Sequence, residues 1–274
     1  MRTSLIIARN TFRETIRDRI LYLLAVFAAV VIVLSKALGW VSVEQDQQII
    51  SDLSLLAISL FCVIIAVFVG TGLIYKELDK RTIYTILSRP VHRWEFVLGK
   101  YLGLTFTICL MAVLMELFFL GFLAVLGYFP EGDGLRLTLW ALLLIHGEIV
   151  IITAVALTLS LLASPILSAV LTLVVWLAGN ASQEIMYLSG TMQELGEQSG
   201  QQIYGLLAWV SRGIYCITPH LNYFSEVKSF AVWPGAHAAA EITLLTVGGR
   251  LLYALGYCVV LLCISVLLFR RRSF

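Results

Sequence analysis

Two long apolar stretches of the sequence carry ionisable side chains near their middles. Glu116 lies within residues 97–128, and His146 and Glu148 lie within residues 136–163. A charge at the centre of a bilayer costs at least ~3 kcal/mol, so such groups usually face protein or water and often belong to ion or proton pathways. These residues are therefore candidates for a translocation path, and the alternative is a buried structural hydrogen bond.

His146 and Glu148 are expected to face different surroundings, because residues two apart on a helix point about 200° apart. His146 shares a stripe with Thr153 and Ser160 at spacings of seven residues, which makes a candidate polar seam. Glu148 points to an otherwise apolar side of the same helix. This position favours a neutral carboxylic acid that is hydrogen-bonded to a neighbouring helix.

No known catalytic spacing accompanies these residues. The sequence has no HExxH, GxSxG or Walker A motif, and Gly99-Lys100 lacks the upstream glycine spacing of a phosphate-binding loop. The five cysteines include no CxxC pair, so no metal site is expected. We therefore expect a protein that is not an enzyme, binds no cofactor of its own and draws energy from a partner or an ion gradient.

A membrane-embedded framework must position these side chains. The chain has 274 residues, of which 60% are hydrophobic and 13% are charged, and its mean hydropathy is +0.93. Soluble domains are about half apolar and a quarter charged, so this composition excludes an ordinary soluble domain. The sequence predicts an all-α membrane protein with one transmembrane domain over residues 1–274.

Six apolar stretches are long enough to cross about 30 Å of hydrocarbon, which takes roughly 20 residues. They cover about residues 20–40, 53–75, 97–128, 136–163, 165–188 and 247–269. Residues 2–19 alternate arginines with apolar residues at helical spacing, which favours a helix in the membrane interface. Ser164-Pro165 is typical of a helix start and makes the connection between the fourth and fifth stretches very short.

The basic residues indicate how these stretches cross the membrane. Five lysines and arginines precede the first stretch, six lie between the second and the third or in its first turn, and three close the chain. With six crossings, these fourteen of the nineteen basic residues share one side, which the positive-inside rule makes cytoplasmic. Both chain ends are therefore predicted to be cytoplasmic.

Residues 189–246 do not fit a seventh crossing. Their longest apolar run, 203–217, has fifteen residues and is interrupted by Arg212, which is short for a span. A seventh crossing would also place the three terminal arginines outside. We expect one or two re-entrant or interfacial helices on the outer face.

The segment 76–102, KELDKRTIYTILSRPVHRWEFVLGKYL, follows the second stretch on the cytoplasmic side. It is dense in charges of both signs, yet it also carries a pattern of apolar residues. A segment that only joins two spans has little need of this pattern, whereas an amphipathic segment that docks onto another protein requires it. The alternative is a helix end that rests in the lipid headgroups.

This segment resembles the loop after the second helix in permeases of the type-2 ABC exporters, the ABC-2 superfamily. The resemblance rests on an acidic residue and a threonine before ILSRP, then on R-x-E-F-x-x-G-K-Y-x-G. The form is most similar to the branch of the nitrous-oxide-reductase maturation and gliding-motility permeases. Its matching residues are Glu77, Thr82, Ser88, Arg89, Pro90, Arg93, Glu95, Gly99 and Lys100. The layout of an N-terminal interfacial helix, six spans and outer helices is also similar, while the length of 189–246 departs from the family.

The resemblance implies a permease that dimerises with itself or a similar permease in the bacterial cytoplasmic (inner) membrane. It implies a separate ATP-binding-cassette subunit on the cytoplasmic side that carries ATP and magnesium, and no nucleic acid. The coupling element that receives the ATPase movement would lie in this segment. Its residues are Glu77, Asp79, Arg81, Thr82, Ile83, Ile86, Leu87, Arg89 and Pro90. The turn at 163–166 would be a second, smaller contact.

Two function classes follow. The first is the permease subunit of an ABC exporter that moves or remodels its substrate with ATP hydrolysed by the partner. The alternative is an ion-coupled secondary transporter that uses Glu116, His146 and Glu148 for protons. Such transporters commonly show two related halves, which this sequence lacks. A membrane-embedded enzyme is disfavoured by the absent catalytic motifs.

Overall fold

The computed structural model describes residues 2–39, 46–79, 92–199, 201–224 and 243–271. These residues form nine helices and no strand, which confirms the predicted all-α class. The helices are α1 (Arg2–Thr15), α2 (Arg19–Gly39), α3 (Asp46–Asp79), α5 (Arg93–Leu126), α6 (Asp133–Ser160), α7 (Pro165–Asn180), α8 (Ser182–Ser199), α9 (Gln202–Ile217) and α11 (Leu244–Arg271).

Five helices are long and apolar enough to cross a membrane, and they correspond to the predicted first, second, third, fourth and sixth spans. They are α2, α3 over Asp46–Gly72, α5 over Trp94–Leu126, α6, and α11 over Leu244–Phe269. The bent pair α7 and α8 makes a sixth if it is taken as one span. The chain is therefore a multi-pass membrane protein.

The buried helix α6 lies at the centre of the bundle. It packs against α3 and α11 and also contacts α5 and α7. Most of its apolar side chains are buried, whereas only 22% of the most apolar part of α2 and 17% of that of α11 are buried, so both helices have exposed faces. In a membrane protein such exposed faces lie against lipid or against another subunit. The bundle core is therefore formed mainly by α3, α5 and α6.

The predicted fifth span, residues 165–188, is not one continuous helix. Its start at Pro165 is confirmed, with Ser164 in extended conformation before it. The helix ends at Asn180, and α8 leaves it at an angle of 68°. The prediction of a helix that continues to residue 188 was therefore wrong.

The cause of the break is a contact with a segment about forty residues further along the chain. The N–H of Leu221 donates to the carbonyl of Gly179 at 3.0 Å, and a Cβ on Gly179 would lie 2.6 Å from the carbonyl oxygen of Pro219. Just beyond the break, the Ser182 hydroxyl donates to the side-chain oxygen of Asn222 at 2.7 Å. This segment therefore holds the end of α7 where α8 turns away.

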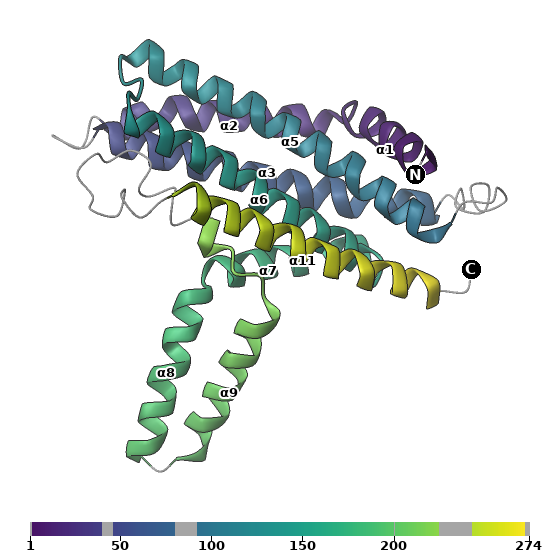
Figure 1. The fold of residues 1–274 in the computed structure, drawn as a ribbon, viewed down its shortest axis with the longest axis vertical. Coiled ribbons are helices and arrows are strands. Elements are labelled where there is room, and N and C mark those ends of the chain that lie inside the picture. The colour runs from purple at the N-terminus through teal and green to yellow at the C-terminus, as the bar shows by residue number, and fades with distance from the viewer. Residues whose placement is uncertain (1, 40–45, 80–91, 200, 225–242, 272–274) are drawn as a thin grey trace.

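Helices α8 and α9 form a hairpin that projects from the bundle, roughly across the direction of its long helices (Figure 1). The two helices pack chiefly against each other, and Ser189 donates to the carbonyl of Ala208 at 3.3 Å. The predicted outer helices within 189–246 therefore exist as the end of α8 and α9. Residues 225–242 lie outside the described residues, and the placement of the hairpin in the outer membrane interface stays a prediction.

Candidate functional site

The predicted coupling segment begins on a described helix and then leaves the described part of the chain. Glu77 and Asp79 belong to the last turn of α3. The other predicted coupling residues lie outside the described residues: Arg81, Thr82, Ile83, Ile86, Leu87, Arg89 and Pro90. The structure thus shows the two ends of the segment 76–102, which are the last turn of α3 and the first turns of α5.

Helix α3 runs without a break past its membrane-spanning part. It comprises 34 residues, from Asp46 to Asp79, whereas its apolar span ends at Gly72. At 3.6 residues per turn, the helix continues for about two turns beyond the span. Glu77 therefore sits on the same continuous helix as the membrane-spanning residues.

On the other side of the segment, the first turns of α5 pack closely against α1. A Cβ on Gly99 would lie 2.8 Å from the carbonyl oxygen of Ser4, and a Cβ on Gly103 would lie 2.5 Å from the carbonyl oxygen of Ala8. The two glycines are four residues apart and lie on one face of α5, so they let the two backbones approach closely. The beginning of α5 is thereby fixed to the N-terminal helix.

The contact between α1 and α5 continues along both helices. The rings of Phe12 and Phe106 lie 5.2 Å apart, and the buried Lys100 amino group lies 3.9 Å from a carboxylate oxygen of Glu14. Helix α1 therefore runs alongside the first turns of α5, with Leu5 on its exposed side. Its predicted position in the membrane interface stays a prediction.

A second part of the candidate site surrounds Glu148 in the bundle core. This residue is 1% exposed. Its Oε2 accepts a hydrogen bond from the Ser59 hydroxyl of α3 at 2.8 Å, and its Oε1 accepts one from the Trp176 indole N–H of α7 at 2.8 Å. One carboxyl group thus connects three helices, which is the structural role that the alternative reading gave to Glu148.

Glu116 and His146 form a separate contact between α5 and α6. The ring nitrogen Nδ1 of His146 lies 3.5 Å from Oε1 of Glu116 and 3.0 Å from the carbonyl oxygen of Leu142. Because a carbonyl oxygen only accepts, Nδ1 carries a hydrogen in the shorter contact. Glu116 is buried and His146 is partly exposed, so the pair lies at the edge of the core.

His146 and Glu148 both belong to α6 but contact different neighbouring helices, as their spacing of two residues predicts. His146 meets α5, whereas Glu148 meets α3 and α7. Thr153, a member of the proposed polar seam, finds its hydrogen-bond partner within α6 itself. Its hydroxyl donates to the carbonyl of Ile149 at 2.7 Å. Among the described residues, no group of three His, Cys, Asp or Glu side chains is arranged to hold a metal ion.

Sequence reasoning missed the partners of these residues. Ser59 and Trp176 give no sign in the sequence that they meet Glu148, because they lie on helices whose packing is set by tertiary contacts. The Gly99–Gly103 contact left a clearer signal, since two glycines four residues apart are typical of close helix packing in membranes. Reading that spacing together with the N-terminal helix would have predicted a close contact on this face of α5.

The buried polar contacts and the long apolar helices define an all-helical, multi-pass membrane protein. Comparison with known families then gives a closer assignment. The model of the family described as ABC-2 family transporter protein matches residues 5–274, and the chain belongs to this family. No curated protein gives a significant match. The chain is thus a permease of the ABC transporter type, as the sequence resemblance implied.

Proposed function

We propose that this protein is the transmembrane permease subunit of an ABC-2 exporter that works with a separate ATP-binding subunit. The observation that carries the proposal is the family match over residues 5–274. The complex would contain two permeases and two ATPase subunits, with ATP and magnesium bound by the ATPase. Residues 1–274 would form a single permease domain in the bacterial cytoplasmic membrane, with both ends cytoplasmic. Within the ABC-2 permeases, the segment 76–102 is most similar to the nitrous-oxide-reductase maturation and gliding-motility permeases, so we place the protein in that branch.

The geometry at the cytoplasmic end supports the proposed coupling. Helix α3 extends past its apolar span to Asp79, and α5 begins at Arg93, next to its close contact with α1. A subunit that docks between these two helix ends would move α3 directly and would move α5 together with α1. In Figure 1 the start of α5, helix α1 and the end of α11 lie at the same end of the bundle.

The residues of the segment have distinct parts in the proposal. Ile83, Ile86 and Leu87 would supply the apolar anchor, since a few buried side chains usually dominate such contacts. The charged residues Asp79 and Arg81 would set the docking orientation, as would Arg89. Thr82 and Pro90 would belong to the same element, with Pro90 restraining its exit. Glu77 would transmit the movement to α3.

The test compares binding and coupling in separate variants. Ile86→Asp and Leu87→Asp are expected to lower co-purification of the ATPase at least tenfold, which is the effect of losing about 1.4 kcal/mol at an apolar anchor. Glu77→Ala is expected to leave the complex assembled but to uncouple ATP hydrolysis from the transported activity. Co-purification and ATP turnover in proteoliposomes measure the two effects.

A matched control makes the same chemical change on the predicted outer side. Ile203 lies on α9 and is 62% exposed, so Ile203→Asp should leave ATPase binding unchanged. If all three segment variants bind and couple like the unaltered protein, the segment is only a linker at the headgroups and the proposed coupling is wrong.

The ion-coupled transporter remains the second candidate, because Glu116 and His146 contact each other across two helices. Titratable groups at membrane depth are a common feature of proton pathways. Vesicles that contain the permease without the ATPase would distinguish the two functions. Substrate-independent proton uptake that is lost in Glu116→Gln would favour the second candidate over the first.

A further inference from the structure

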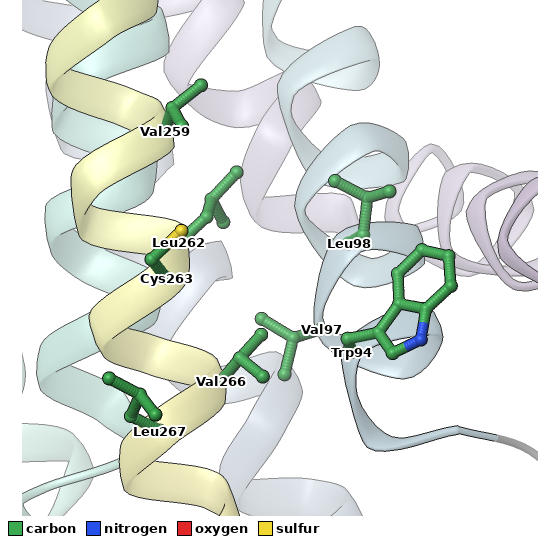
Figure 2. A pocket seen from close by; sticks show the side chains of 8 residues that line it. All are labelled: Trp94, Val97, Leu98, Val259, Leu262, Cys263, Val266 and Leu267. Carbon is green, nitrogen blue, oxygen red and sulfur yellow. The ribbon is translucent and has the colours of Figure 1, made fainter.

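An apolar groove of about 480 Å³ lies between the first turns of α5 and the last turns of α11 (Figure 2). Trp94, Val97 and Leu98 line it from α5, and Val259, Cys263 and Val266 are among the residues that line it from α11. Its lining side chains are apolar, apart from the Cys263 thiol and the indole N–H of Trp94. The groove lies within the membrane-spanning parts of both helices, so water is not its natural occupant.

The two helices hold the groove in a fixed shape. The rings of Phe96 and Phe269 stack 5.7 Å apart, with 14° between their planes. Phe96 is 7% exposed and Phe269 is 2% exposed. These two buried rings join α5 to α11 next to the groove, whose own lining from Cys263 and Val259 stays exposed. The groove is therefore a surface feature of an already packed helix pair.

The size of the groove favours a thin, extended occupant. An α-helix with its side chains is about 10–12 Å wide and rises about 5.4 Å per turn, so about 480 Å³ accommodates little more than one turn. Most of the length of a helix from another subunit would therefore lie outside the groove. An acyl chain is far thinner and can lie along the nine residues from Val259 to Leu267, which extend for about 12 Å of helix.

Basic residues stand at one end of each helix that borders the groove, and they indicate the kind of lipid. Arg93 is the first residue of α5, and Arg270 and Arg271 are the last two of α11. The predicted topology places these helix ends at the cytoplasmic leaflet, whose anionic lipids attract basic residues. Trp94 is 43% exposed at the same end, and tryptophan is typical of the interface between headgroups and acyl chains.

From these observations we infer that the groove binds an acyl chain of one anionic phospholipid from the cytoplasmic leaflet. Its headgroup lies beside the arginine-bearing ends of α5 and α11. This inference stands apart from ATPase coupling and does not depend on it.

The test counts the lipids that the full-length protein retains. The protein is equilibrated in vesicles with equal amounts of phosphatidylglycerol and phosphatidylethanolamine, then extracted and weighed by native mass spectrometry. Cys263→Trp fills the groove and is expected to reduce the tightly bound phosphatidylglycerol at least fivefold. Leu245→Trp is the matched control, because Leu245 lies at the other end of α11 and is 84% exposed; it should retain lipid like the unaltered protein.

A second comparison tests the headgroup. Replacing Arg93, Arg270 and Arg271 together by glutamine should lower the preference for phosphatidylglycerol by about fivefold for each arginine removed. Replacing the same three residues by lysine should keep the preference. The glutamine variant should still bind a lipid chain, which then shows no headgroup preference.

Three results would overturn the inference. Equal lipid retention in Cys263→Trp and Leu245→Trp would show that the groove holds no lipid. Loss of a second protein copy, instead of a lipid, from Cys263→Trp would make the groove a contact between permeases. An unchanged headgroup preference in the glutamine variant would show that the arginines do not select the lipid.

Discussion

At the residue scale, Glu148 shows how a carboxyl group is accommodated inside the bundle. Its two oxygens accept hydrogen bonds from α3 and from α7. An unsatisfied polar group in a hydrocarbon environment costs several kcal/mol, so these two donors make the buried position tolerable. Glu148 thereby ties its own helix to both neighbours, and we assign it a structural part in the fold.

The indole of Trp176 is the donor that is easiest to remove without changing the shape of the site. Trp176→Phe is expected to lower the free energy of unfolding by about 0.5–2 kcal/mol, because one oxygen of a buried carboxyl loses its donor. Unfolding by denaturant in detergent micelles measures this change. The control is Trp209→Phe on α9, where the side chain is 79% exposed. Equal stability of the two variants would contradict the structural role of Glu148.

The sequence predicts the chemistry of these residues better than their partners. The 200° separation of His146 and Glu148 follows from helix geometry alone and matches their contacts with different helices. The identity of Ser59 and Trp176 as donors depends on how α3 and α7 pack on α6, and no local pattern encodes that packing. The direction in which a helical residue points can therefore be predicted from the sequence, whereas the residues that it contacts are known only from the fold.

At the element scale, the contact between α1 and α5 depends on glycines that leave room for a second backbone. A Cβ on Gly103 would lie 2.5 Å from the carbonyl oxygen of Ala8, whereas a Cβ on Gly121 of the same helix meets no atom within 4 Å. We expect Gly103→Ala to destabilise the contact by about 1–3 kcal/mol through overpacking. Gly121→Ala should have almost no effect.

Hydrogen–deuterium exchange separates these two outcomes. In Gly103→Ala, the amides of α1 should exchange faster than in the unaltered protein, while those of α6 stay protected. In Gly121→Ala, exchange in α1 should be unchanged. Identical exchange of α1 in both variants would show that α1 does not need the close approach at Gly103.

The limits of helix prediction also lie at this scale. Long apolar stretches predicted α2, α3, α5, α6 and α11, because length and hydropathy decide whether a helix can span a bilayer. The break after Asn180 could not be predicted in the same way. It depends on Leu221 and Pro219, which reach the end of α7 only after the chain has passed through the α8–α9 hairpin.

At the scale of the whole molecule, the distribution of basic residues predicts how the chain crosses the membrane. We expect reporter fusions after Gln47, Arg89, Gly132, Gln198 and Arg272 to read outside, inside, outside, outside and inside. The position after Gln198 is the most informative one, because it tests whether α7 crosses despite its bend against α8. A cytoplasmic reading there would place the hairpin on the wrong side and overturn the topology of the last third.

Both the family assignment and the proposed coupling imply a complex of the permease with an ATP-binding subunit. The long α3 and the fixed start of α5 are arranged so that a cytoplasmic subunit could move both helices. A permease of this size would need a second copy to enclose a path that two ATPase subunits can alternate. The sequence resemblance predicts this assembly, and the proposed coupling would engage the end of α3 and the start of α5.

The most direct measurement is the mass of the intact complex after co-expression of the permease with its ATP-binding subunit. Native mass spectrometry in detergent should show two copies of each chain, and ATP turnover by this complex should depend on Glu77. A stable permease monomer that transports without any ATPase would contradict the account and would support an ion-coupled transporter instead.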